Sequence, residues 1–178
     1  MKKIPLIKIS KKIYEKKGIA AGPFSDCLAC KCGRRGRGGA CCENGVYADK
    51  ESYDLIIKHR AVLEKRVGLK LEKCFDRGYA KDTEFLGNKA IGTRVRNNTC
   101  VFRSSQGCEI VKLVIEKKLS KRMIPSGCRL YPITWDKGRL FLERIRKNCV
   151  YSAAGDKVKK TFYDIFKDDI NDIFVFHE

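Results

Sequence analysis

Residues 27–42 read CLACKCGRRGRGGACC, and this stretch holds five of the ten cysteines of the chain. A hydrophobic core would space such residues along one face of a helix or strand, whereas these lie among glycine and arginine. Glycine allows tight turns and a left-handed backbone, the freedom that a chain needs to wrap several thiolates around one ion. Five clustered thiols can form a disulfide cluster, a metal site or a redox centre.

The order of the cysteines argues against disulfides. Cys41 and Cys42 are adjacent, with Cα atoms about 3.8 Å apart, which is below the usual separation of a bridged pair. Lysines interrupt every apolar run in the first residues, MKKIPLIKISKKIYEKK, so we expect neither a signal peptide nor a membrane span and expect a cytoplasmic, reducing location. Clustered cysteines in that compartment are more often metal ligands or catalytic groups than disulfides. Metal binding is the favoured interpretation, followed by redox-active thiols and then by a disulfide framework.

The composition predicts one folded domain over residues 1–178, since 43% of the residues are hydrophobic and 10% are aromatic. The formal net charge of +18 suits attraction to nucleic acid, anionic lipid or an acidic protein partner. It also suits a solvated surface, and the dispersed lysines favour that interpretation. Arg34, Arg35 and Arg37 resemble an RGG-like nucleic-acid-binding tract, although a flexible basic insertion between ligands is the favoured alternative.

Local patterns predict a small α+β domain with few helices and short strands, organised around cysteine-ligated metal sites. The N-terminal arm, residues 1–22, has an edge strand or extended segment at 4–9, and a short strand is expected over 90–95. A turn at Asn97-Asn98 and a hairpin that starts at residue 133 follow. An amphipathic helix over 156–178 is expected to close the core, with an acidic outer face that pairs with the basic body.

Two further helices are predicted from apolar spacing. One begins after Asp49, which occupies the N-cap position, and ends at Gly68; its apolar face is formed by Tyr53, Ile56, Ile57, Leu63 and Val67. Cys74 follows as a buried or spare thiol. The other covers 109–122, with Ile110, Leu113 and Val114 on one face, and is expected to end at Pro125 and Gly127 just before Cys128.

The whole cysteine series resembles the YkgJ-type zinc- or iron-chelating cysteine-cluster family over most of the chain. Cys27 and Cys30 resemble its opening C-x-x-C, and Cys41-Cys42 its paired cysteines. The later motifs of that family resemble four features of this chain: CVF at Cys100, GCEI at Cys108, CRLYP at Cys128 and the terminal Cys149. The resemblance implies eight metal ligands: Cys27, Cys30, Cys41, Cys42, Cys100, Cys108, Cys128 and Cys149.

Two departures from that pattern affect the ligand assignment. Residues 31–40 separate the C-x-x-C motif from the Cys-Cys pair and add Cys32, which competes with Cys30 for one ligand role. We expect Cys30 to be the ligand, because the two-residue gap after Cys27 directs both sulfurs at one ion. The segment between Cys108 and Cys128 is also longer than the family's usual link.

Eight thiolates suit two Cys₄ sites or one cluster, and they suit zinc, iron or an iron–sulfur cluster equally. The expected function is therefore metal binding with a basic surface for a partner. A redox or catalytic enzyme component and a nucleic-acid-binding zinc module remain alternatives. No catalytic residue is predicted, because the chain has no H-E-x-x-H motif, no phosphate-binding loop motif and only two histidines. Arg129 is expected either to donate to a thiolate or to pair with a buried acid.

Overall fold

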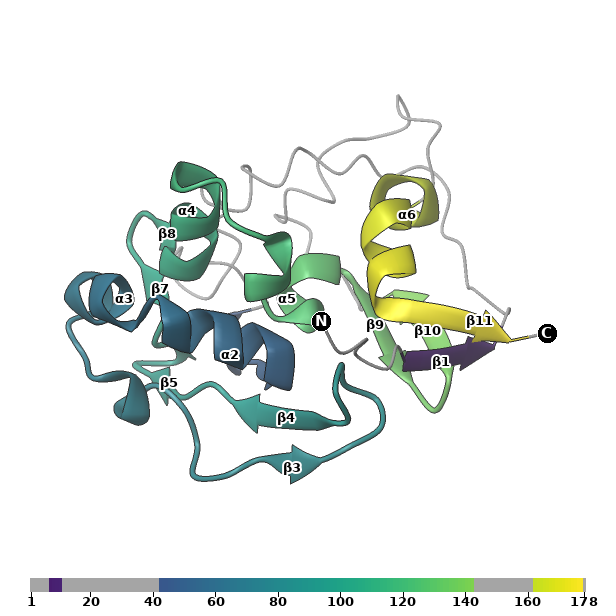
Figure 1. Ribbon diagram of the computed structural model, residues 1–178, viewed down its shortest axis with the longest axis horizontal. Helices are drawn as coiled ribbons and strands as arrows, with labels where there is room; N and C mark the ends of the chain where they lie inside the picture. The colour runs from purple at the N-terminus through teal and green to yellow at the C-terminus, as the bar shows by residue number, and fades with distance from the viewer. Residues whose placement is uncertain (1–6, 11–41, 143–161, 178) are drawn as a thin grey trace.

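The computed structural model describes residues 7–10, 42–142 and 162–177. Its mixture of helices and short, mostly antiparallel sheets confirms the predicted α+β class (Figure 1). Half of the predicted ligands lie outside the described residues: Cys27, Cys30, Cys41 and Cys149. So do Cys32 and the arginines of the glycine-rich loop.

The helices and strands are short, as the frequent turns in the sequence lead one to expect. The helical segments are α2 (Lys50–Lys58), α3 (Arg60–Val67), η3 (Leu71–Lys73), α4 (Glu109–Glu116), η4 (Lys121–Met123), α5 (Ser126–Leu130) and α6 (Phe162–Ile173). The strands are β1 (Ile7–Ser10), β2 (Tyr47–Asp49), β3 (Ala80–Lys81), β4 (Lys89–Gly92), β5 (Val95–Arg96), β6 (Thr99–Cys100), β7 (Arg103–Ser104), β8 (Gly107–Cys108), β9 (Ile133–Asp136), β10 (Arg139–Leu142) and β11 (Phe174–His177).

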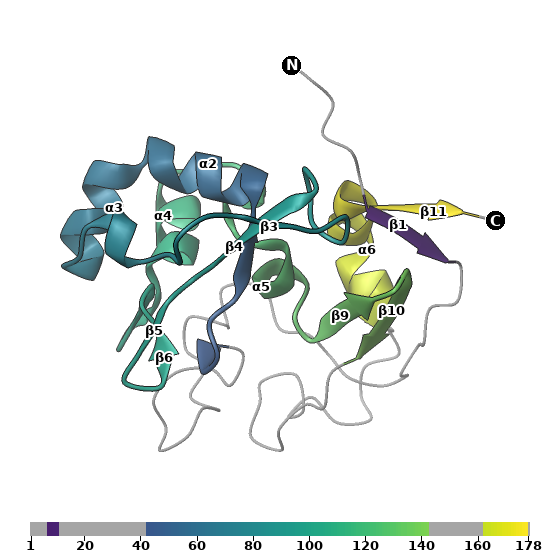
Figure 2. The same cartoon turned by 90° about the horizontal axis from the view of Figure 1, so that it is seen from below.

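These elements form two groups joined by α5. Figure 1 shows α2, α3 and α4 with the β2-β4-β3 sheet on one side, and α6 with the β9-β10 hairpin on the other. On that second side β1 pairs with β11 in parallel, Ile7 opposite Phe174. The segment predicted as an edge strand or extended arm therefore contains a strand, and segments from near both ends of the sequence lie side by side (Figure 2).

A buried apolar cluster holds the first group together. Ile56, Leu63, Phe102, Ile110 and Leu113 are at most 2% exposed. These include residues on the apolar faces predicted for both helices, whose burial is the main contribution to the stability of such short elements. Cys74 is fully buried in the same cluster, as one of its two interpretations predicted.

Helix boundaries differ from the predictions at three points. The helix predicted to run from Asp49 to Gly68 is two helices, α2 and α3, divided at His59. Its predicted end is confirmed, because Gly68 has the left-handed φ of 71° that glycine adopts without strain. Helix α4 ends at Glu116, well before Pro125, because Lys118 has a positive φ of 50°.

The third difference concerns the C-terminal segment. Helix α6 ends at Ile173, and Phe174–His177 form strand β11 where helix was predicted up to residue 178. Phe174, Val175 and Phe176 are aromatic or β-branched, and such residues favour extended pairing with β1 over a further helical turn. Within the described ranges, no helix combines the length and the apolar character that crossing a membrane requires.

Candidate metal centre

Four predicted ligands lie around one small cavity. Cys42, Cys100, Cys108 and Cys128 all line it, and its volume is about 30 Å³. The remaining wall is largely apolar and includes Val46, Ile110, Ile124 and Pro125. The described part of the chain thus brings together every predicted ligand that it contains.

Two tight hairpins position Cys100 and Cys108. Asn97 and Asn98 have positive φ values of 53° and 59°, which close the turn between β5 and β6 and confirm the predicted turn. Cys100 then lies opposite Val95 in this pair. Cys108 ends the second hairpin, opposite Arg103, and is also the N-cap residue of α4.

Helix α5 carries Cys128, and a buried carboxylate holds the start of this helix. Asp49 is fully buried and accepts a hydrogen bond at 2.9 Å from the backbone N–H of Ser126, the first residue of α5. It also accepts one at 3.1 Å from the N–H of Leu86. Asp49 was predicted as the N-cap of α2 and does precede that helix, but its side chain makes no capping bond there. Instead it satisfies a donor that the start of α5 would otherwise leave unpaired.

The backbone between Cys42 and β2 is fixed by Thr93. Val46 N–H donates to Thr93 Oγ1 at 2.8 Å, and the Cys100 thiol donates to the same oxygen at 3.5 Å. Gly45 has a φ of 71°, and a Cβ at this position would lie 2.5 Å from the carbonyl oxygen of Thr93. Only glycine allows this close approach, so Gly45 sets the path of the chain that leads to Cys42.

The environment of the cavity favours neutral thiols when no metal ion is bound. The pKa of Cys108 is raised to about 12, chiefly by burial and also by the nearby Cys42 and Cys100, against lowering hydrogen bonds from the backbone. Burial also raises the pKa of Cys100, against a lowering hydrogen bond with Thr93. Several buried thiolates would repel one another strongly, and a bound metal ion is the usual way in which proteins compensate them.

The donor set fits zinc or iron, since sulfur ligands suit both metals. Cys42, Cys100, Cys108 and Cys128 are the described residues that would hold such a metal. Among the residues of 7–10, 42–142 and 162–177, however, no three Cys, His, Asp or Glu side chains are grouped closely enough to form a metal site. The described cysteines therefore share a cavity without a formed coordination shell.

Arg129 follows Cys128 in sequence, but its guanidinium group contacts acidic residues of α6. Its side chain is 1% exposed; Nη2 lies 2.6 Å from Asp172 Oδ2 and Nε lies 3.2 Å from Asp169 Oδ1. Both acids belong to α6, so the ion pair of the second interpretation is present, although the acids themselves are only half-buried, with side chains 17% and 32% exposed. The predicted pairing of the acidic helix with the basic body is confirmed by the same contacts.

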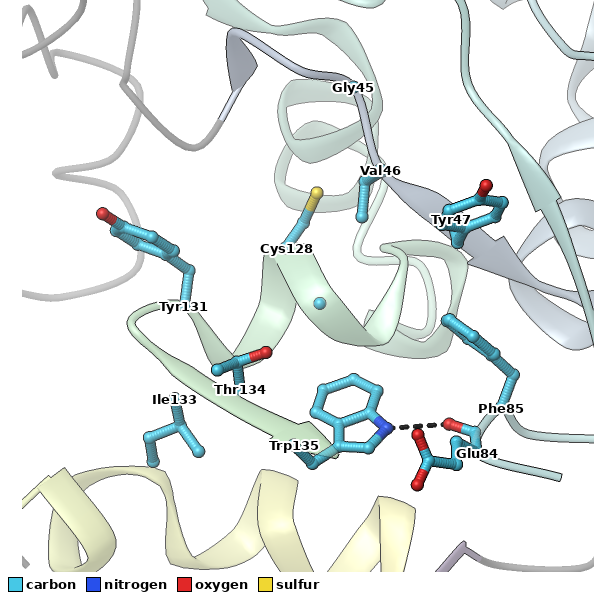
Figure 3. Close-up of a pocket in the computed structure, with 11 residues that line it drawn as sticks. Gly45, Val46, Tyr47, Glu84, Phe85, Cys128, Tyr131, Ile133, Thr134 and Trp135 are labelled. Atoms are coloured by element: carbon cyan, nitrogen blue, oxygen red, sulfur yellow. Dashed lines mark hydrogen bonds between the residues drawn. The ribbon is translucent and has the colours of Figure 1, made fainter. Parts of the chain in front are cut away.

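A larger pocket lies beside the cysteine cavity and was not predicted. Its volume is about 290 Å³, and it shares Gly45, Val46 and Cys128 with the smaller cavity. We call it the aromatic pocket, because Tyr47, Phe85, Tyr131 and Trp135 line it (Figure 3). Figure 3 shows the Cys128 thiol at the Gly45–Val46 end and Trp135 at the opposite end. Trp135 lies in the predicted hairpin that starts at residue 133, but no local pattern connects it with Tyr47 and Phe85.

Comparison with known proteins gives no relative: no family model, no curated protein and no solved structure matches the chain.

Proposed function

We propose that the chain is a metal-binding protein that chelates zinc or iron, including iron in an iron–sulfur cluster, through eight cysteines. The observation that supports this proposal is the meeting of Cys42, Cys100, Cys108 and Cys128 around one cavity. These residues come from four separate segments, and their spacing in the sequence does not require them to meet. The other four ligands of the proposal come from the cysteine pattern of the sequence, which resembles that of the YkgJ-type family: Cys27, Cys30, Cys41 and Cys149.

The chemistry of the bound metal would follow from its identity. Zinc would supply a structural cross-link or a Lewis acid, and iron would supply electron transfer. The protein's own contribution is to hold four thiols in an apolar cavity whose walls are fixed by Asp49 and Thr93. The basic surface of the chain would then be available to a partner.

A redox or catalytic component is the second candidate function. Cys128 lines both the cysteine cavity and the aromatic pocket, so a molecule in that pocket would lie next to a metal ligand. A purely structural metal site is normally closed, whereas a working site keeps an approach for a substrate or electron carrier. This shared wall is what supports the second candidate.

Metal analysis of anaerobically purified full-length protein tests the proposal. We expect zinc or iron to copurify in stoichiometric amount or to bind tightly on addition under reducing conditions. Absorbance near about 400 nm together with acid-labile sulfide would identify an iron–sulfur cluster, because zinc thiolates are colourless there. Protein that contains no metal and takes up neither zinc nor ferrous iron would refute it.

Two buried cysteines make a matched pair of variants. Cys100 lines the cavity, whereas Cys74 is buried in the core and does not line it. Both Cys→Ala changes remove one buried sulfur and should cost about 1 kcal/mol through packing alone. Cys100→Ala should lower the metal content per chain, and Cys74→Ala should retain it. Equal metal contents in the two variants would contradict the assignment of Cys100.

A further inference from the structure

The walls of the aromatic pocket face in several directions. The Phe85 ring lies 5.9 Å from Tyr47 at 55° and 6.3 Å from Trp135 at 65°, measured between ring centroids and planes. Because the ring planes are tilted against one another, the rings present their faces in different directions and do not form a parallel stack. Tyr131 lines the pocket as well and lies on the opposite side from Phe85 in Figure 3. A ligand inside the pocket would therefore meet several aromatic surfaces at once.

The charge of the pocket differs from that of the chain. Lysine and arginine number 39 in the sequence, yet none is among the described residues that line the pocket. Glu84 does line it, next to Trp135 (Figure 3). An acid and several aromatic side chains, without a competing cation, make a site that prefers positive charge.

The wall is held in place before any ligand arrives. Trp135 Nε1 donates to the carbonyl oxygen of Glu84 at 2.8 Å, and Phe174 packs against the indole at a centroid distance of 5.2 Å. The N–H of Glu84 donates to Asp82 Oδ1 at 2.8 Å. Two residues later, the N–H of Leu86 donates to the buried carboxylate of Asp49 at 3.1 Å. A preorganised wall loses little conformational entropy on binding.

Size and access indicate a small ligand. A volume of about 290 Å³ is at the lower end of the range of about 300–1,000 Å³ for ligand pockets. Tyr47 is 55% exposed, so this side chain remains within reach of solvent. An exposed aromatic side chain in the wall of a pocket is available to close over one face of a bound group.

We propose that the aromatic pocket binds a small organic ammonium cation. Aromatic faces and one carboxylate are the groups that recognise alkylated ammonium in water, because the charge is diffuse and poorly hydrated. This proposal stands on the pocket alone and does not require a metal at the neighbouring cysteines.

Choline and its neutral tert-butyl analogue, in which carbon replaces the nitrogen, test the proposal. Calorimetric titration of the full-length protein should show saturable choline binding and at least about tenfold weaker binding of the analogue. Trp135 is the only tryptophan of the chain, so a matching change in its emission would place the ligand in this pocket. Equal affinities for the two molecules, or no saturable binding of choline, would overturn the proposal.

Glu84→Gln removes the negative charge of this side chain and keeps its shape. It should weaken choline binding about three- to tenfold and leave the analogue unaffected. Glu72→Gln is the matched control, because Glu72 pairs with Arg60 on the surface and does not line the pocket. If Glu84→Gln binds choline as tightly as Glu72→Gln does, the carboxylate is not part of the site and the proposal fails.

Tyr47→Ala provides a second test that does not depend on Glu84. Because Tyr47 is largely exposed, this change should leave the fold intact and weaken choline binding. Unchanged choline affinity would contradict the aromatic part of the proposal. Sedimentation with phosphatidylcholine vesicles distinguishes a free cation from a lipid headgroup: we expect the protein to stay in the supernatant, and cosedimentation would overturn the assignment to a small free ligand.

Discussion

The guanidinium of Arg129 and the carboxylate of Asp172 form an ion pair, with Nη2 2.6 Å from Oδ2, across the contact between α5 and α6. Arg129 is 1% exposed, so its charge depends on the acids of α6 for compensation. Arg122 reaches the same carboxylate, with Nε 2.9 Å from Asp172 Oδ1. Asp172 therefore links α6 to α5, the helix that carries Cys128.

Asp172→Asn should destabilise the fold by about 2 kcal/mol, because it removes charge-assisted hydrogen bonds from a buried guanidinium. Thermal or urea denaturation would measure this loss. Asp168→Asn, on the exposed face of the same helix, is the control and should change stability little. Equal stabilities of the two variants would show that the ion pair contributes nothing measurable.

The same pair predicts how stability depends on pH. Burial raises the pKa of Asp172, but hydrogen bonds from Arg122 and Arg129 outweigh this effect, so the pKa lies below its ordinary value of 3.8. A carboxyl group whose pKa is lowered by folding stabilises the fold above its ordinary pKa, and this contribution disappears as the pH falls through the lowered value. Acid unfolding of the wild type should therefore be steeper than that of Asp172→Asn. Parallel curves would argue against the coupling.

Metal removal should unfold or aggregate the protein, because closed thiolate sites contribute directly to folding energy. We expect a chelator to lower the melting temperature of the wild type, and Cys128→Ala to lower it without a chelator. Cys74→Ala is the control for loss of a buried sulfur and should keep its response to the chelator. An unchanged melting temperature after verified removal of the metal would contradict this prediction.

Alkylation of the native, metal-loaded protein should label Cys32 first and Cys74 more slowly, with the eight predicted ligands protected. Cys74 is fully buried, and burial raises its pKa to about 11, so little reactive thiolate exists at neutral pH. Its labelling should accelerate as the pH rises. Mass spectrometry of the labelled peptides gives the order, and labelling of Cys30 with protection of Cys32 would reverse the ligand assignment.

Gly45→Ala and Gly68→Ala form a matched pair for the approach to the cysteine cavity. Both glycines have a φ of 71°, but a Cβ at Gly68 meets nothing within 4 Å, whereas one at Gly45 lies 2.5 Å from the Thr93 carbonyl oxygen. Gly68→Ala should cost about 1 kcal/mol. Gly45→Ala should cost more and also reduce metal content. Equal melting temperatures and metal contents would show that the Gly45–Thr93 contact is unimportant.

The net charge of +18 predicts weak, salt-sensitive nucleic-acid binding through Arg34, Arg35 and Arg37 and the dispersed lysines. Filter binding at low salt should retain RNA or DNA, and replacing these arginines with alanine should reduce retention. A similar number of Lys→Ala changes in α2 and α3 should reduce retention less, because those lysines are dispersed whereas the three arginines are clustered. Without retention at low salt, the basic residues act only as a solvated surface.

Local sequence signals predicted the turns well, because turn geometry depends on a few adjacent residues. Asn97-Asn98 and Gly68 adopt the left-handed backbone expected of them, and the turn at Lys137-Gly138 joins β9 to β10 with positive φ at both residues. The apolar spacing of Ile110, Leu113 and Val114 correctly placed the buried face of α4. These features need no knowledge of tertiary contacts.

Features that depend on distant contacts could not be predicted in this way. Cys128 lies in a short helix whose first N–H is bound by Asp49, a partner 77 positions away from Ser126. The aromatic pocket likewise combines Tyr47, Phe85 and Trp135, whose neighbours in sequence give no sign that the three rings meet. The meeting of four cysteines at one cavity was expected only through family resemblance, since cysteine spacing does not determine which thiols share a site.

The parallel pairing of β1 with β11 has a consequence for the order of events during protein synthesis. Ile7 is synthesised 167 positions before its partner Phe174. Until then β1 exposes unpaired backbone groups, so it is a natural contact for chaperones or for the same strand of another nascent chain. The half of the fold that contains α6, β1 and β11 can therefore close only after residues 174–177 have been synthesised, whereas the half that contains α2 and α4 can form earlier.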